Sequence, residues 1–200
     1  MLLLIKYTLL YGIVLMLVAL GGMFSEHSGI INIALEGIMV IGGVAGVLTL
    51  TMLPADMSPF LVVLISVLVA ALAGIVYSLL LAFASINLKA DQTIGGTALN
   101  LMAPALVLFL IRIIANQNTL QMATGDSASW FMLKKSTFGV DKSVDWGFFG
   151  ETFLNKIYLA TYICILLFII LSVILYKTKF GLRLRACGEN PQAADSLGIN

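Results

Sequence analysis

Charged residues are scarce in this sequence. Only 10% of its 200 residues are Asp, Glu, Lys or Arg, whereas 60% are hydrophobic. A soluble domain carries about 25% charged residues, so this composition excludes an ordinary soluble fold. The formal net charge of +1 says little about partners, because the charges are segregated along the chain. A nucleic-acid polymer is not expected as a partner.

Residues that build metal centres and disulfide frameworks are also few. The chain has one histidine, His27, and two cysteines, Cys164 in an apolar run and Cys187 in a polar tail. This pattern indicates neither a disulfide framework nor a histidine-cluster metal site. The motifs GxxxxGK[ST], GxSxG, HExxH and CxxC do not occur. We therefore expect no enzyme, no ATP site and no cofactor or metal bound by this chain.

Long runs without charge are what the sequence does contain. A helix needs about 20 apolar residues to cross a bilayer. We predict an all-α fold, a polytopic transmembrane helical bundle with about five spans, forming one transmembrane domain over residues 1–200. The first apolar run is interpreted as a retained span, because no cleavage motif and soluble domain follow it. The predicted spans are residues 7–25, 37–53, 60–88, 93–111 and 157–176.

Two polar segments lie outside these spans. Residues 116–156 contain equal numbers of lysines and acids, whereas residues 177–200 begin with a dense cationic cluster. The positive-inside rule places the cationic segment in the cytoplasm and makes residues 116–156 an external loop. Counting back through five spans puts the N-terminus outside. Lys6 argues against that, and a re-entrant segment near residues 25–36 would reverse it, so the sequence does not decide the orientation.

The stretch SEHSGIINIALEG, residues 25–37, mixes polar and apolar side chains between two spans. Backbone inside a bilayer must satisfy its own hydrogen bonds unless it lines a cavity. The stretch is therefore either a broken helix at a pore or an interfacial turn followed by a helix start. Glu36 allows the same two interpretations, as a carboxylate on a translocation path or as an acid favoured by a helix N-terminus.

A second polar stretch, LKADQTIGGTALN, covers residues 88–100 and enters the fourth span. Thr97 and Asn100 can donate or accept hydrogen bonds across a helix interface, and the glycines between them and the loop allow close approach. These side chains either contribute to a path or serve helix packing.

Two pairs of small residues have the spacing of helix-packing faces. Gly42 and Gly46 form one small-xxx-small pair, and Ala70 and Gly74 form another. Such pairs let helix backbones approach closely within a membrane. We assign both pairs to packing.

The C-terminal stretch GENPQAADSLGIN predicts a short capped helix. Asn190 is a suitable N-cap, Pro191 is favoured at the first helical position, and Gly198 is a suitable stop. About two turns of helix are marginal alone in water, so this helix is expected to pack against something. It either belongs to an amphipathic segment on the lipid surface, held by Arg183 and Arg185, or docks onto a cytoplasmic protein.

Three stretches in order resemble permease subunits of bacterial ABC importers. They are GGMFSEHSGIINIALEGIMVIGG, LKADQTIGGTALNLMA and KFGLRLRACGENPQAADSLGIN. The resemblance is to the branch that includes branched-chain amino acid, ribose-type sugar and nucleoside permeases. The wording of the first stretch is most similar to nucleoside permeases that work with a lipoprotein receptor.

The resemblance implies a multi-pass subunit of the bacterial plasma membrane that takes part in nucleoside import. Its implied partners are the lipid bilayer, an ATP-binding subunit that hydrolyses the ATP, a second permease subunit of the same or a sister chain, and an extracytoplasmic substrate-binding lipoprotein. Residues 177–200 are implied to form a cytoplasmic coupling loop. The predicted path residues are Ser28, Asn32, Glu36, Thr97 and Asn100. The implied ATPase-coupling residues are Gly188, Glu189, Asn190, Pro191, Ala193, Ala194, Asp195, Leu197 and Gly198.

The resemblance also has a departure and a competitor. Family members are longer and place further spans after the coupling loop, so we expect an N-terminal portion of a larger permease that lacks the second half of the pore. The competing hypothesis is a secondary transporter or channel driven by an ion gradient, with Glu26, His27 and Glu36 as its relay. The sequence does not determine the exact substrate.

Overall fold

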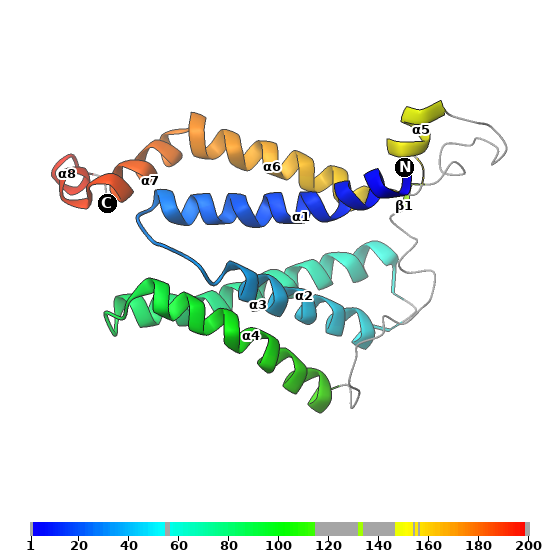
Figure 1. The fold of residues 1–200 in the computed structure, drawn as a ribbon, viewed down its shortest axis with the longest axis horizontal. Helices are drawn as coiled ribbons and strands as arrows, with labels where there is room; N and C mark the ends of the chain where they lie inside the picture. The colour runs from blue at the N-terminus through cyan, green and yellow to red at the C-terminus, as the bar shows by residue number, and fades with distance from the viewer. Residues whose placement is uncertain are drawn as a thin grey trace. The chain divides into compact units, whose positions relative to one another are not determined.

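Helices make up most of the structure, a computed structural model that describes residues 2–54, 57–114, 132–133, 147–153, 155 and 157–198. Within this part of the chain, five helices are long and apolar enough to cross a membrane. The prediction of an all-α, polytopic bundle with about five spans is confirmed. The five helices are α1 (Leu2–His27), α2 (Leu35–Met52), α3 (Pro59–Ile86), α4 (Gln92–Ile114) and α6 (Leu159–Lys177), shown in Figure 1.

The helix ends differ somewhat from the predicted spans. α1 begins earlier, at Leu2, and α4 continues past Arg112 to Ile114. α6 begins only at Leu159, because Ile157–Tyr158 forms the short strand β2. β2 pairs antiparallel with β1 (Met132–Leu133), with Met132 opposite Tyr158.

The predicted external loop, residues 116–156, lies largely outside the described residues. The described parts are β1, the short helix α5 (Gly147–Phe153) and Asn155. The position of this loop relative to the membrane stays a prediction.

Contacts divide the chain into two compact units, and each is described by itself. One comprises Met1–Phe24 with Asp126–Asn200, and the other comprises Ser25–Gly125. The assignment of the whole chain to one transmembrane domain therefore stays a prediction.

In the unit of residues 25–125, α2 contacts both α3 and α4. Its buried apolar cluster draws residues from all three helices: Ile41, Tyr77, Ala103, Val107 and Ile111. Most other large apolar side chains of these helices point outward. Such a surface is an aggregation hazard in water, whereas lipid chains are as apolar as the side chains themselves.

The predicted glycine packing is confirmed between α2 and α3. A Cβ at Gly42 would lie 3.1 Å from the carbonyl oxygen of Ala70, and a Cβ at Gly46 would lie 3.3 Å from the Ala70 Cβ. A Cβ at Gly74 would lie 3.4 Å from Cγ2 of Ile38. The two helices therefore approach at the positions where side chains are smallest.

In the other unit, α6 is followed by two further helices, α7 (Lys179–Glu189) and α8 (Pro191–Ser196). The sequence analysis named no helix over residues 179–189, where the structure has α7, and the assignment of residues 177–200 to a coupling loop stays a prediction. The N-cap of α7 is Thr178, whose hydroxyl oxygen accepts a hydrogen bond from the Gly181 backbone N–H at 3.3 Å. This cap and the packing of Gly181 against α6 favour a helix that a sequence with two glycines did not suggest.

Candidate functional site

The chain is unwound between α1 and α2, over residues 28–34. We call this stretch the unwound segment. It begins with a Schellman motif: Gly29 has φ +83°, its N–H donates to Glu26 at 3.0 Å, and the Ile30 N–H donates to Ser25 at 3.2 Å. Such a motif satisfies the last carbonyls of α1 and ends the helix. Both sequence interpretations contained a break here, and the structure contains one.

Local polar groups shape the rest of the unwound segment. The Asn32 side-chain oxygen accepts a hydrogen bond from the Ala34 N–H at 3.0 Å, which is an Asx turn. Ser25 Oγ donates to the Ile30 carbonyl at 2.8 Å, and Ser28 Oγ donates to the Ser25 carbonyl at 2.6 Å. The polar residues of this stretch therefore bind its own backbone.

α4 supplies the remaining partners of the unwound segment. Gln92 Oε1 accepts a hydrogen bond from the Ile31 N–H at 2.9 Å. Two turns further along α4, Asn100 Nδ2 donates to the Ile33 carbonyl at 2.7 Å. Asn100 Oδ1 accepts from the Gly37 N–H at 2.7 Å. The backbone on both sides of Asn32 is thus bonded to one face of α4.

The Gly37 bond makes Asn100 the N-cap of α2, supplied from another helix. Gly37 is the third residue of α2, and its N–H is one of the donors that have no partner within the helix. The residue at the cap position is Ala34, which provides no side-chain hydrogen bond. Asn100 occupies that role from α4 instead.

Two glycines allow this close contact between the unwound segment and α4. Gly96 lies between Gln92 and Asn100 on the same face, and a Cβ there would be 3.2 Å from the backbone nitrogens of Ile33 and Ala34. A Cβ at Gly37 would be 3.0 Å from Asn100 Oδ1. Any larger residue at either position would push the segment away from α4.

α3 contributes a hydrogen bond to α4 at the residue next to Asn100. The buried Tyr77 hydroxyl donates to the Leu99 carbonyl at 2.6 Å. Pro104 lies four residues after Asn100 within α4, and proline has no N–H to bond the Asn100 carbonyl. The continuous helix α4 thus lacks one backbone hydrogen bond at the level where it holds the unwound segment.

The structure brings together some of the predicted path residues. Asn32 and Asn100 both belong to the hydrogen-bonded unwound segment and its α4 support. Glu36 is exposed in the first turn of α2, where the helix dipole favours an acid. Thr97 is exposed, and its hydroxyl donates to the Thr93 carbonyl of its own helix at 2.8 Å. A path role for these residues and Ser28 stays a prediction.

Sequence reasoning missed Gln92 and Tyr77. Both act through backbone groups far away in the sequence, and neither has a motif around it. Gln92 directly follows Asp91, whose side chain caps α4 by accepting from the Thr93 N–H at 2.8 Å and the Ile94 N–H at 3.1 Å. The bonds from Ile94 and Thr93 hold the pKa of the Asp91 carboxyl below its ordinary value of 3.8.

The tail helix α8 has the predicted caps. Asn190 Oδ1 accepts from the Ala193 N–H at 3.1 Å, Pro191 is the first helical residue, and Gly198 has φ +73°. The helix predicted from these residues is confirmed, and its coupling role stays a prediction.

The predicted coupling residues divide by exposure. Ala194 is 3% exposed, so its side chain holds α8 within its own unit. Leu197, by contrast, is 79% exposed, and Asp195 is exposed beside it. Gly188 is half-buried at the end of α7. The remaining predicted coupling residues are exposed: Glu189, Asn190, Pro191, Ala193 and Gly198.

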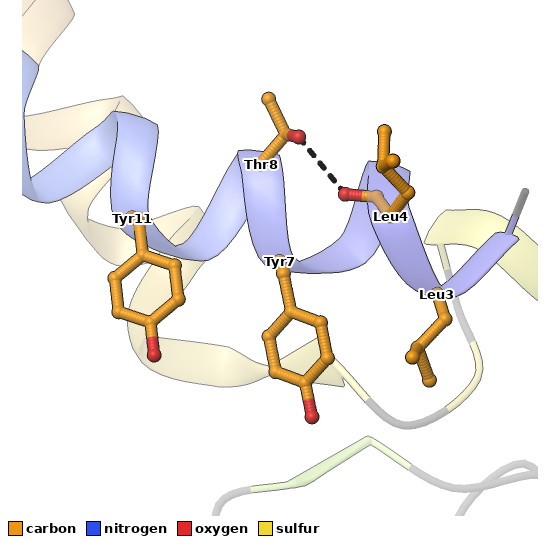
Figure 2. A pocket seen from close by; sticks show the side chains of 5 residues that line it. All are labelled: Leu3, Leu4, Tyr7, Thr8 and Tyr11. Carbon is orange, nitrogen blue, oxygen red and sulfur yellow. Dashed lines mark hydrogen bonds between the residues drawn. The ribbon is translucent and has the colours of Figure 1, made fainter.

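A shallow hollow on α1 has no features of a binding site. Figure 2 shows Tyr7 and Tyr11 projecting from the same face of this helix, their rings stacked with centroids 6.3 Å apart. Thr8 donates to the Leu4 carbonyl at 2.9 Å, so its hydroxyl is used within the helix. Exposed tyrosines near the end of a span are typical of membrane-interface anchors. In the residues that the structure describes, no three His, Cys, Asp or Glu side chains gather as metal ligands.

Comparison with known proteins gives a family match over nearly the whole chain. The model of the family described as "Branched-chain amino acid transport system / permease component" matches residues 4–200. A nucleoside ABC transporter permease protein, NupC of Lactococcus lactis subsp. cremoris, is 40% identical over 96% of this chain and 57% of its own length. A guanosine ABC transporter permease protein, NupQ of Bacillus subtilis, is 39% identical over 96% of this chain and 58% of its own length.

More distant similarity extends to another substrate class. A putative glucose ABC transporter permease protein, TsgC13 of Haloferax volcanii, is 26% identical over 93% of this chain and 51% of its own length. The chain thus spans a little over half the length of these curated relatives. No solved structure matches it significantly.

Proposed function

Because this chain belongs to the permease-component family of branched-chain amino acid transport systems, we propose that it is the membrane-spanning subunit of an ATP-driven nucleoside importer. The observation that carries the proposal is the sequence identity of 40% and 39% to permeases named for nucleosides and guanosine, over 96% of the chain. Family membership and the five apolar helices make the chain a multi-pass protein of the plasma membrane. It is a transport component and not an enzyme.

The proposed importer obtains its energy from a partner. An ATP-binding subunit hydrolyses ATP, and this chain binds no cofactor of its own. We assign the contact with that subunit to α8, supported by the exposed Leu197 and Asp195 at the end of a well-capped helix. A second permease subunit and an extracytoplasmic substrate-binding lipoprotein complete the proposed assembly.

The unwound segment is the proposed element of the translocation path. Gln92, Asn32 and Asn100 bond backbone groups of Ile31, Ala34 and Ile33, which lowers the cost of placing the segment at membrane depth. Transport then follows alternating access, in which ATP hydrolysis in the partner shifts the population between two packings of the spans.

Co-purification tests the coupling contact. The full-length protein is isolated from its native membrane in mild detergent, and the associated proteins are identified by peptide mass spectrometry. We expect a stoichiometric ATPase that is lost with Asp195→Lys and retained with Asp195→Glu, because only the first reverses the charge. Thermal unfolding of the permease in detergent is the control for folding. Absence of an ATPase from the unmodified protein would contradict the proposal.

Uptake experiments test the substrate and the energy source. Cells that carry the importer are given labelled guanosine with competing nucleosides, branched-chain amino acids or sugars. We expect competition by nucleosides alone, and we expect uptake to persist when an uncoupler removes ion gradients while ATP is maintained. Uptake that collapses with the uncoupler would favour the gradient-driven alternative.

A further inference from the structure

The position of α7 is set by the helix before it. α6 is a membrane span, and Thr178 is the one residue between its end at Lys177 and the start of α7 at Lys179. Figure 1 shows the chain changing direction at this point before it continues to α8. α7 therefore starts where a span leaves the apolar part of the bilayer.

One side of α7 is fixed against the end of α6. A Cβ at Gly181 would lie 2.0 Å from the Leu175 carbonyl oxygen, a distance that only glycine permits. One turn later, Arg185 Nε donates to the Gly181 carbonyl at 3.3 Å, and its guanidinium carbon lies 5.5 Å from the centroid of the Tyr176 ring. Gly181 and Arg185 thus mark the side of α7 that faces α6.

The apolar and the cationic residues near Gly181 lie on different sides of α7. Successive residues are about 100° apart, so Phe180 and Leu182 project to opposite sides of the α6 contact. They are 59% and 63% exposed. Lys179 and Arg183 are two positions from Gly181, which turns them away from α6, and both are exposed. Apolar side chains therefore flank the span, and cations lie on the opposite side.

We propose that α7 lies in the membrane interface, with Phe180 and Leu182 among the acyl chains beside α6 and with Lys179 and Arg183 at anionic lipid headgroups. Lipid is the proposed occupant because the two apolar residues continue the exposed apolar surface of a span, and the cations complement phosphate. The positive-inside rule assigns this interface to the cytoplasmic leaflet, whose anionic lipids attract such residues.

The proposal divides the tail into two parts and does not rest on transport activity. Arg185 is engaged with α6, so Arg183 is the arginine of this pair that remains exposed to headgroups. α7 contacts both α6 and α8. Lipid contact along α7 would therefore fix the distance at which α8 projects from the membrane.

Single-tryptophan variants of the full-length protein test the position of α7. The native tryptophans are replaced by phenylalanine, and Phe180→Trp is compared with the control Gln192→Trp on exposed α8. Both proteins are reconstituted into vesicles of phosphatidylcholine and phosphatidylglycerol. We expect brominated lipid to quench most of the emission at position 180, with a blue-shifted spectrum, and aqueous iodide to quench only position 192.

The charge contribution has its own comparison. We expect brominated lipid to quench position 180 less in vesicles of phosphatidylcholine alone, and this dependence on phosphatidylglycerol to vanish when Lys179→Gln and Arg183→Gln are introduced together. Iodide quenching at position 180 equal to that at 192 would place α7 in water. Protection from both quenchers would mean that protein covers it. Either result overturns the proposal.

Discussion

Replacing Asn100 tests the central joint of the structure. Asn100→Leu keeps a side chain of similar size but removes the bond to the Ile33 carbonyl and the bond from the Gly37 N–H, each 2.7 Å long. A hydrogen bond contributes about 0.5–1.5 kcal/mol net, and a buried group left unsatisfied costs about 1–3 kcal/mol. Water can bond the carbonyl of the exposed Ile33 in place of Asn100, whereas the N–H of the buried Gly37 would be left without a partner.

The Gly37 N–H therefore contributes most of the stability that Asn100→Leu is expected to lose. Because Ala34 offers no side-chain cap to α2, removal of Asn100 uncaps this helix, at a cost of about 0.5–2 kcal/mol. With the loss at Ile33, we expect a total of about 2 kcal/mol. By the scaling for domains of this size, that lowers the unfolding temperature by about 4–8 °C.

The assay is thermal unfolding of the full-length protein in detergent, followed by loss of the monodisperse peak in size-exclusion chromatography. Thr97→Val is the matched control, since Thr97 lies on the same helix and its hydroxyl bonds only its own helix. The control should change the unfolding temperature little. If Asn100→Leu unfolds at the same temperature as the unmodified protein, the hydrogen bonds do not hold the unwound segment and the argument fails.

Three further perturbations address other contacts. Gly181→Ala places a Cβ 2.0 Å from the Leu175 carbonyl oxygen, so the same assay should show a loss of about 3 kcal/mol, the upper end of the usual cost of overpacking. Unchanged stability would contradict the close contact of α6 and α7. Gly96→Val should cost about 1–3 kcal/mol by overpacking against the unwound segment, whereas Gly43→Val, with no atom within 4 Å of the added Cβ, should unfold at nearly the original temperature. The cap at Asp91 has a lowered pKa, so its stabilisation is present above the unfolded pKa and is lost as pH falls through the folded pKa; Asp91→Asn should flatten the acid limb of a stability-against-pH profile, and an unaltered limb would rule this out.

Local chemistry made part of this structure predictable. Charge-free runs located the five long helices, because span length and apolarity are properties of consecutive residues. The α8 helix was predictable from Asn190, Pro191 and Gly198, since a cap acts within about one helical turn. The contact of Gly42 and Gly46 with α3 was predictable because small-residue spacing identifies the packing face of a helix.

The unwound segment shows what local chemistry does not contain. Gln92 bonds the backbone of Ile31, 61 positions away, and only the folded arrangement brings them together. One weak signal was present: α2 begins after Ala34, without Ser, Thr, Asp or Asn at its cap, which indicates a partner elsewhere. α7 was missed because Gly181 is unfavourable in an isolated helix, whereas in the fold its missing side chain permits the contact with α6.

The unwound segment is bonded to its two neighbouring helices in different ways. Toward α1, the connection consists of the cap bonds of Gly29 and Ile30 and of the hydroxyl bonds of Ser25 and Ser28. Gly29 has a backbone conformation that other residues rarely adopt. Toward α4, Gln92 and Asn100 bond the segment directly, and Gly96 brings the backbones into contact. Side chains of distant residues therefore tie the unwound segment to α4, whereas its connection to α1 rests on bonds among neighbouring residues, which explains why only the second was visible in the sequence.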